Sequence, residues 1–306
     1  MKSFREGDLS LSDEIFRLFQ NLIYTTAGIK LSSQKKGLLT SRLLRRLKKT
    51  GLDSFRGYYR KVKEDSDELV EMLNCISTNT THFFRENHHF EYFKNKIIPE
   101  LLRIKSSEKT IRIWSAGCST GEEPYSIAIT VCEALRQAGH RHGETGTRRH
   151  GEVTDSPIHR FTDSAANGWD IKVLATDIST KVLDTAKNGI YEYEAVSDTS
   201  DSIVRRYFLR GTEENVGKIK VRDFLKNIIK FRRLNLKDGA YPFKKEFDVI
   251  FCRNVMIYFD EDMKQHVITM FHKHLPENGH LFLGHSETMF GGNGFKPVFI
   301  TVYKKQ

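Results

Sequence analysis

The stretch I-R-I-W-S-A-G-C-S-T-G-E-E-P, residues 111–124, decides how this chain folds. Its first residues, Ile111–Ser115, are apolar enough for a short buried strand, AGCSTG is a glycine-rich turn, and a helix is expected over Glu122–Gln137. Gly117 and Gly121 let the backbone approach a ligand closely, and the first N–H groups of the helix are free to bind one. The same pattern also occurs as a tight connection that binds nothing, so it leaves both interpretations open.

Strands and helices continue to alternate downstream of this stretch. We expect strands at Lys172–Thr176, Ile228–Arg232, Phe247–Cys252 and His280–Gly284, helices at Ser179–Asn188 and Asp262–Leu275, and a closing hairpin within Phe295–Tyr303. Apolar strands separated by helices predict a mainly parallel sheet covered on both faces. The fold class is therefore α/β.

The segment upstream of the central stretch carries helical patterns only. Helices are predicted from Asp13 to Ala27, from Ser32 or Ser33 to Gly51, from Asp53 to about Val62 and from Ser66 to Ile76. On the second of these, Leu39, Leu43 and Leu47 recur at helical spacing and predict a buried stripe. We expect a small helical domain over residues 1–76, a linker and connecting helix over 77–104, and an α/β domain over 105–306.

Two segments interrupt the rhythm of the α/β domain. Residues 138–170 are polar, contain Gly and His, and have no periodicity, which predicts a mobile surface insertion. Residues 190–230 contain short apolar runs separated by Gly211 and Gly217, which predict a small antiparallel β-subdomain. The four histidines in the first of these segments have no zinc-site spacing, and we expect no metal.

The charge of the chain is concentrated in one place. The formal net charge is +10, yet residues 30–63 alone carry +11, residues 1–29 carry −1 and residues 64–306 are neutral. A basic protein suggests nucleic acid as a partner, but a neutral α/β domain argues against a long basic track. The four cysteines have no C-x-x-C spacing, and neither a secretory signal nor a membrane span is seen, so we expect a cytoplasmic protein.

Three further positions have the residue types of a ligand site. Asp177 ends the second strand, where an acid binds ribose hydroxyls or caps the next helix. Arg253, Asn254 and Tyr258 follow the FDVIFC strand, at the edge where open α/β sheets bind ligands. Asn254 could equally be a turn residue, and Tyr258 a core aromatic. Arg85 stands in the linker N-T-T-H-F-F-R-E, where a surface ion pair is the alternative.

Taken together, these motifs resemble those of the CheR family of chemotaxis receptor glutamate O-methyltransferases. The segments that carry the resemblance are AGIKLSSQKKGLLTSRLLRRLKKTGLDSF (27–55), NTTHFFRENHHF (79–90), WSAGCSTGEEPYSIAI (114–129), ATDIS (175–179), AKNGIYEYE (186–194), RYFLRGT (206–212), FDVIFCRNVMIYFD (247–260) and GHSE (284–287). Long motifs in one order are far more specific than a glycine pattern. The match covers about residues 10–290 without the 138–170 insertion.

The resemblance implies a Rossmann-like S-adenosyl-L-methionine-dependent methyltransferase with a helical N-terminal domain and an inserted β-subdomain. It implies methyl transfer to glutamate side chains of methyl-accepting chemotaxis receptors, with S-adenosyl-L-homocysteine as the other product. The residues it implies for the cofactor site are Asn79, Thr81, Arg85, Gly117, Glu123, Asp177, Asn235, Leu236, Arg253 and Asn254. Arg85 and Tyr258 are the candidates for acting near the transferred methyl.

The resemblance also places receptor contacts on the basic helix. These would be Arg42, Arg45, Arg46 and Lys48. Whether a C-terminal tethering peptide of the receptor docks on the β-subdomain stays open, although the hairpin RGTEENVGKIKVR (210–222) offers a place for it. We expect a monomer that neither binds nucleic acid nor inserts into the membrane.

Two features depart from related patterns, and three other functions compete. Ser115 ends the first strand, where many other methyltransferase families have an acid, and the 138–170 insertion is absent from compact CheR proteins. The competing functions are a nucleic-acid methyltransferase that uses the basic helix, a nicotinamide-dependent dehydrogenase and a non-catalytic receptor adapter. A base-labile methyl ester as product would separate the first of these from a glutamate methyltransferase.

Overall fold

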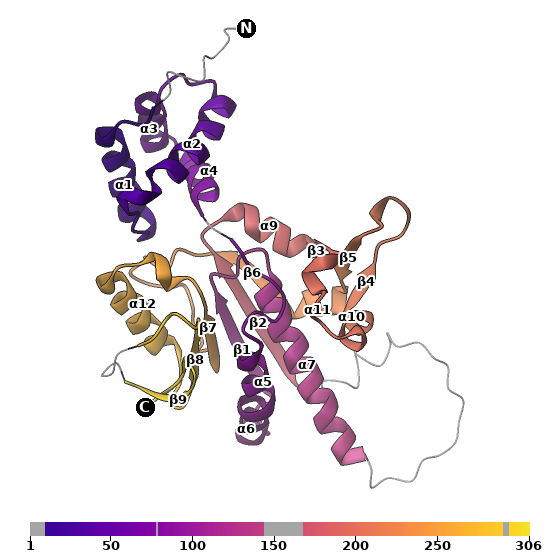
Figure 1. Ribbon diagram of the computed structural model, residues 1–306. Helices are drawn as coiled ribbons and strands as arrows, with labels where there is room; N and C mark the ends of the chain where they lie inside the picture. The colour runs from indigo at the N-terminus through magenta and orange to yellow at the C-terminus, as the bar shows by residue number, and fades with distance from the viewer. Residues whose placement is uncertain (1–9, 78, 144–167, 290–293) are drawn as a thin grey trace.

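The computed structural model describes residues 10–77, 79–143, 168–289 and 294–306. Its first part is a bundle of four helices, drawn in indigo and purple in Figure 1. These are α1 (Asp13–Ala27), α2 (Lys36–Thr50, after a 3-10 turn at Ser33–Lys35), α3 (Phe55–Glu64) and α4 (Ser66–Ile76). Ser12 caps α1 through the N–H of Ile15, and Gly28 ends it in the left-handed conformation, so the helix has the bounds that the sequence predicted.

The helical bundle has an apolar core of its own. Leu39, Leu43 and Leu47 of α2 are all buried in it, which confirms the predicted stripe. Phe19 of α1 and Tyr58 of α3 are fully buried against them. Burying these side chains stabilises the bundle by roughly 1.5–3 kcal/mol each.

A connecting helix leads from the linker into the sheet. It consists of α5 (Asn87–Tyr92), a π-helical turn at Phe93–Ile97 and α6 (Ile98–Ile104). The connecting helix predicted within residues 77–104 is thus present over 87–104, with one wider turn in its middle. Pro99 lies in the first turn of α6, where the N–H that it lacks matters least.

The second part of the chain is built around a seven-stranded sheet. The strands, in the order in which they pair, are β6 (Ile229–Arg233), β2 (Asp170–Asp177), β1 (Thr110–Ala116), β7 (Val249–Cys252), β8 (His280–Leu283), β10 (Val302–Lys305) and β9 (Phe295–Phe299). The first five are parallel, and the β9–β10 hairpin closes the sheet antiparallel to β8. The α/β prediction is confirmed. The order runs outward from β1 in both directions, so a topological switch point lies between β1 and β7.

Helices cover both faces of this sheet, as Figure 1 shows. The connecting helix and α7 (Glu122–Gly143) lie on one face, where Ile111 and Ile113 of β1 join their core. On the other face, α12 (Glu261–His274) packs against Trp114 of β1. The helix α9 (Thr180–Asn188) follows β2. Alternate residues of one strand thus enter opposite cores, as in a sheet that is buried on both sides.

The antiparallel β-subdomain is present. It pairs β3 (Ile190–Glu192), β5 (Lys218–Val221) and β4 (Phe208–Arg210) in that order, with α10 (Asp201–Tyr207) and α11 (Asp223–Ile228) beside them. From residue 229 onward the chain has returned to the main sheet, because β6 pairs with β2. The subdomain therefore ends slightly earlier than predicted.

The predicted insertion begins too early. Residues 138–143 continue α7, because one glycine inside a helix, here Gly139, does not by itself end the helix. Residues 144–167 make up most of the predicted insertion and lie outside the described residues. The prediction of a mobile surface insertion therefore stays a prediction for them. Across the described ranges, no helix is long and apolar enough to cross a membrane.

Candidate active site

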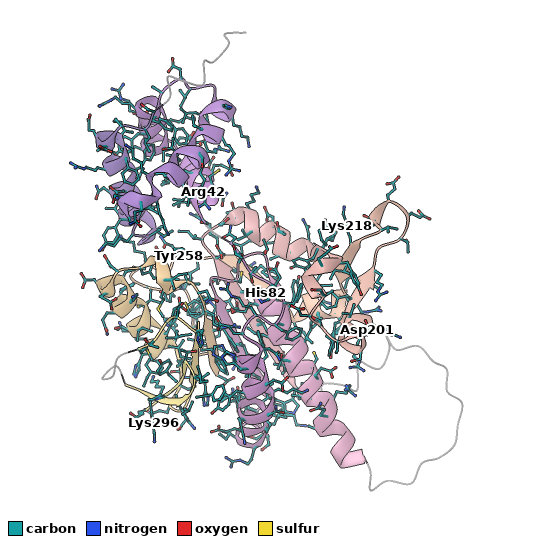
Figure 2. The ribbon with its side chains drawn as sticks, viewed as in Figure 1. Arg42, His82, Asp201, Lys218, Tyr258 and Lys296 are labelled. Atoms are coloured by element: carbon teal, nitrogen blue, oxygen red, sulfur yellow. The ribbon has the colours of Figure 1, made fainter. Side chains whose placement is uncertain are left out.

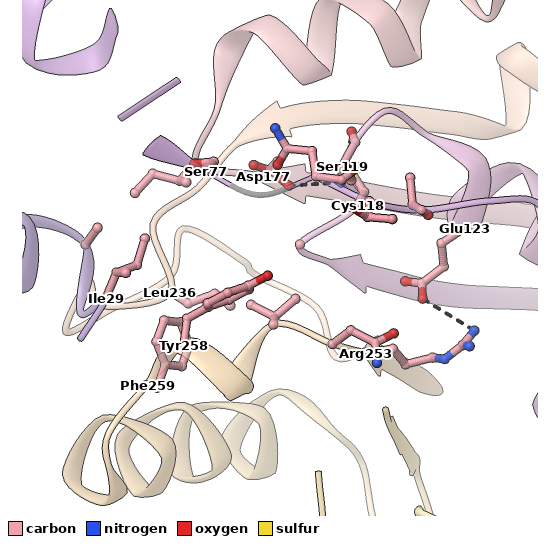
Figure 3. Close-up of a pocket in the computed structure, with 18 of the residues that line it drawn as sticks. Ile29, Ser77, Cys118, Ser119, Glu123, Asp177, Leu236, Arg253, Tyr258 and Phe259 are labelled. Atoms are coloured by element: carbon pink, nitrogen blue, oxygen red, sulfur yellow. Dashed lines mark hydrogen bonds and ion pairs between the residues drawn. The ribbon is translucent and has the colours of Figure 1, made fainter. Parts of the chain in front are cut away.

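One pocket lies over the carboxyl ends of β1, β2 and β7, and residues of the helical domain and the linker complete its lining (Figure 3). The predicted residues Asn79, Thr81, Arg85, Gly117, Glu123, Asp177, Asn235, Leu236, Arg253, Asn254 and Tyr258 all line it. They come from the linker, from three strand ends, from the first turn of α7 and from the loop after β6. The structure therefore brings together every position that the sequence proposed for cofactor binding and catalysis.

The glycine-rich turn after β1 forms one wall of the pocket. Gly117 has φ +81°, and a Cβ there would lie 2.3 Å from Cγ2 of Val255, so only glycine fits. The N–H groups of Gly117 and Cys118 both donate to the carbonyl of Thr176, at 2.8 and 2.9 Å. This pair of hydrogen bonds folds the turn back across the end of β2.

Asp177 is held by backbone N–H groups on both of its carboxylate oxygens. The N–H of Ser119 donates to Oδ2 (Figure 3), and the N–H of Ser179 donates to Oδ1, each at 2.9 Å. Burial raises the pKa of Asp177, and these N–H groups oppose the shift. The cap of α9 is Ser179, whose hydroxyl accepts from Val182 N–H. Asp177 is thus not the helix cap, and its carboxylate lines the pocket.

Glu123 and Arg253 lie on the opposite wall of the pocket. Oε1 of Glu123 accepts from the Ser115 hydroxyl at 2.7 Å, and Oε2 lies 3.6 Å from Nη1 of Arg253. Burial raises the pKa of Glu123, and Arg253 opposes this. Ser115, which departed from other methyltransferase patterns, therefore orients a carboxylate that the following helix supplies.

Sequence reasoning missed Glu86, which lies beneath this wall. Its carboxylate is 3.2 Å from Nη2 of Arg253 and accepts from Nδ2 of Asn254 and from the N–H of His285, also at 3.2 Å. Burial alone would raise the pKa of Glu86, but Arg253 and the two N–H donors hold it below its usual value. Glu86 directly follows Arg85 in the quoted linker motif, which is the one signal that could have pointed to it.

The linker brings Arg85 to the pocket. Phe83 is buried among Tyr191 and Phe208 of the β-subdomain and fixes the linker in place. Nη1 of Arg85 donates to the carbonyl of Thr80 at 2.9 Å. Within the described part of the chain, no carboxylate lies at ion-pair distance from Arg85, so the surface ion pair considered above is not formed.

Tyr258 lies where the two domains meet. It is half-buried and lines the pocket, with the ammonium of Lys35 5.4 Å from its ring centroid. Its carbonyl accepts from the N–H of Lys30 at 2.9 Å. Tyr258 is therefore a residue of the pocket rather than of the apolar core.

Asn235 and Lys237 attach the loop after β6 to the end of α1. Nδ2 of Asn235 donates to the carbonyl of Thr26 at 2.7 Å, and Nζ of Lys237 donates to that of Thr25. These carbonyls have no partner within the helix, and side-chain donors from the sheet domain satisfy them. Asn235 thus helps to hold the helical domain over the pocket.

The basic helix α2 corrects one prediction. Arg45, Lys48 and Lys49 are exposed, but Arg46 is only 7% exposed, and its Nη2 lies 2.7 Å from Oε2 of Glu68. The prediction that Arg46 shares an exposed docking face is therefore wrong. Its acidic partner comes from α4 and is not visible in the periodicity of α2.

Arg42 extends from the basic helix to the pocket itself. It lines the pocket and donates to the carbonyl of Ile76. Figure 2 shows Arg42 at the lower edge of the helical domain, with Tyr258 and His82 below it on the other domain. One cation of α2 and the strand-end side chains thus border the same space.

The fold and this pocket define a class of protein. A parallel sheet with a glycine turn after its first strand and a carboxylate after its second holds nucleoside-containing ligands at the switch point. Across the described ranges, no group of His, Cys, Asp and Glu side chains has the arrangement of a metal site. The class is that of the nucleoside-binding α/β proteins.

Comparisons with known proteins define the family. Residues 79–144 and 159–304 match the family model described as CheR methyltransferase, SAM binding domain, and residues 14–77 match CheR methyltransferase, all-alpha domain. The chain therefore belongs to the CheR methyltransferase family and is an S-adenosylmethionine-dependent chemotaxis methyltransferase.

Similar proteins include chemotaxis protein methyltransferases from two bacteria. The one from Borreliella burgdorferi is 37% identical, over 96% of this chain and 94% of its own length. The one from Escherichia coli is 40% identical, over 91% of this chain and 86% of its own length. Among solved structures, the glycopeptide N-methyltransferase MtfA complexed with S-adenosylmethionine has a TM-score of 0.26 at 11% identity, covering 61% of this chain and 48% of that one.

The residues of the pocket suit S-adenosylmethionine chemically. Asp177 and Glu123 line it with carboxylate oxygens, which are the acceptor type that ribose hydroxyls and an ammonium group require. Apolar side chains such as Leu236 and Ile178 provide a wall for a purine ring. The pocket thus contains acceptors for both polar parts of the cofactor and an apolar surface for the rest.

Proposed function

We propose that this chain transfers a methyl group to glutamate side chains of methyl-accepting chemotaxis receptors and produces glutamyl methyl esters. The observation that carries this proposal is that Arg42, a cation of the basic helix, lines the same pocket as Asp177 and Arg253. A positively charged helix beside the pocket favours an acidic substrate segment.

The cofactor, when bound, supplies an electrophilic methyl group on a sulfonium centre. A glutamate carboxylate is already ionised at neutral pH, so the protein needs no general base to activate it. The chain's own residues then have to orient the carboxylate and exclude water. This agrees with a pocket that is lined by Arg85 and Tyr258 and closed by the helical domain.

The side chains of the pocket have distinct roles in this proposal. Asp177 holds the ribose and Glu123 the amino-acid end of the cofactor, while Asn79, Thr81, Gly117, Asn235, Leu236, Arg253 and Asn254 complete its site. Arg85 orients a carboxylate, since it lines the pocket and no acid lies at ion-pair distance from it among the described residues. Tyr258 shapes the space next to the transferred methyl.

The proposed receptor contacts lie on α2. Arg42, Arg45 and Lys48 would meet the acidic stretch that contains the substrate glutamates, and Lys49 extends this exposed surface. Arg46 is not part of it.

We also propose that the β-subdomain docks a C-terminal tethering peptide of the receptor. Ile190 and Leu209, 48% and 43% exposed, both lie opposite Lys220 in the antiparallel register. The outer strand β4 has no partner on its far side among the described strands. An edge strand with exposed apolar and basic side chains is suited to adding a peptide strand.

Incubation with methyl-labelled S-adenosylmethionine and receptor-containing membranes tests the main proposal. We expect label on the receptor that mild base releases as methanol, because a glutamyl methyl ester hydrolyses under those conditions. Membranes without receptor are the control, and nucleic acid is offered as a competing acceptor. Absence of base-labile label from every receptor, or base-stable label on nucleic acid, would refute the proposal.

Receptors that lack their C-terminal tail test the tether, because tail removal should slow their methylation.

A further inference from the structure

The loop after β7 carries much of the pocket but has little regular structure. Arg253, Asn254 and Tyr258 all belong to it, and it contains a single 3-10 turn at Met256–Tyr258. Asn254 has φ +60°, in the left-handed region that side chains rarely adopt. The N–H groups of Tyr258 and Phe259 bond within the loop, to the carbonyls of Val255 and Met256, but those of Asn254 and Ile257 have no backbone partner there and still need one.

Glu287 of the GHSE motif supplies those partners. Its Oε2 accepts from the N–H groups of Asn254 and Gly284, both at 2.7 Å, and its Oε1 accepts from Ile257 N–H at 3.1 Å. The side chain is 5% exposed. Within the described part of the chain, no cation is ion-paired with it. Backbone N–H donors alone thus satisfy a buried carboxylate, and such charge-assisted hydrogen bonds are the strong ones.

The side chains of Glu287 and Asn254 pack closely against Gly284. A Cβ at Gly284 would lie 2.6 Å from Nδ2 of Asn254 and 2.7 Å from Oε2 of Glu287. The end of β8 is therefore packed directly against the loop after β7.

Other side chains hold the first part of the loop. Arg253 is anchored by Glu86 and Glu123, and the side chain of Asn254 by Glu86. Glu287 instead accepts hydrogen bonds from the backbone N–H groups of Asn254 and Ile257. Ile257 directly precedes Tyr258. Its effect is thus directed to the part of the loop next to the proposed methyl-transfer space.

We propose that Glu287 is a positioning residue that sets the placement of Tyr258 for methyl transfer without contacting substrate or cofactor. The proposal rests on the function proposed above for its effect on turnover. The proposal gives a role to the GHSE motif, which neither the fold nor the cofactor site explains.

Glu287→Gln is the primary test, with Glu246→Gln, an exposed glutamate far along the chain, as the matched control. Glutamine keeps one carbonyl oxygen and replaces the other with a donor, which would face a backbone N–H. We expect kcat to fall about 10- to 100-fold, while the Kd for S-adenosylhomocysteine stays within about threefold of wild type.

Hydrogen exchange separates this proposal from the proposed function. The amides of Asn254 and Ile257 should exchange slowly in wild type and faster in Glu287→Gln, whatever the substrate is. Unchanged protection in a folded variant, or normal kcat despite lost protection, would overturn the positioning role. Equal losses in turnover and in affinity for S-adenosylhomocysteine would also overturn it, because they would indicate that Glu287 contacts the cofactor. If wild type methylates no receptor but the amides lose protection as expected, the substrate assignment fails and the anchoring of the loop stands.

Discussion

Arg46 and Glu68 form a buried ion pair between α2 and α4, with Nη2 2.7 Å from Oε2 and both side chains less than a tenth exposed. Nε of Arg46 also donates to Oε1 of Glu68, and the hydroxyl of Tyr58 donates to the same oxygen. The most buried cation of the basic helix therefore holds the helical domain together.

Arg46→Ala should destabilise the helical domain by about 3 kcal/mol or more, because it leaves Glu68 buried without its cation. Urea unfolding followed by circular dichroism measures this. Arg45→Ala is the matched control, since Arg45 is exposed on the same helix and should change stability by less than about 0.5 kcal/mol. Equal unfolding midpoints for the two variants would contradict the structural role.

Arg45→Glu combined with Lys49→Glu should weaken receptor methylation through lost electrostatic attraction. Both side chains are exposed. We expect kcat/KM for the receptor to fall about tenfold at low salt and the difference from wild type to shrink at high salt, where exposed charges are screened. The Kd for S-adenosylhomocysteine should not change. A salt-independent defect would argue against a docking surface.

Arg85→Ala and Tyr258→Phe should each lower turnover more than cofactor affinity, by about 10- to 100-fold in kcat, because they disturb orientation rather than binding. Steady-state kinetics and titration with S-adenosylhomocysteine measure the two effects. Arg85→Lys keeps the charge but not the planar group, and should recover only part of the loss. Wild-type turnover in both Arg85→Ala and Tyr258→Phe would remove these assignments.

The order of elements could be predicted because local signals agree with the fold. Ser12 and Gly28 mark the ends of α1, and the apolar run before Gly117 marks β1. The residues of the pocket were predicted as a set from the resemblance to a family and not from their spacing in the sequence. What could not be predicted depends on partners distant in sequence. Glu68 buries Arg46, Ser115 orients Glu123, and Glu287 binds the backbone of a loop some thirty residues before it. No pattern within one segment encodes such pairs.

The helix α7 shows the limit of composition as a signal. Polar residues with Gly139 among them predicted a loop from residue 138, yet the helix continues to Gly143. Helix ends are set by caps and packing, and a hydrophilic stretch is compatible with either state.

Acidification should destabilise the protein through two buried histidines. Burial lowers the pKa of His280 to about 4, and burial followed by the charge of Arg253 lowers that of His89 to about 4. In the unfolded chain these histidines bind protons near pH 6.5, whereas in the folded chain they stay neutral. Their neutral state therefore leaves the free energy of unfolding undiminished above pH 6.5. The free energy of unfolding decreases as the pH falls from 6.5 toward 4. Each histidine should cost about 2 kcal/mol between pH 7 and pH 5.

The variant His280→Gln isolates this effect. Gln does not titrate, so the loss of unfolding free energy between pH 7 and pH 5 should be smaller in the variant by about 2 kcal/mol, whatever its stability at pH 7. Urea unfolding at the two pH values measures the difference. The same pH dependence in wild type and His280→Gln would show that His280 is not held neutral by burial.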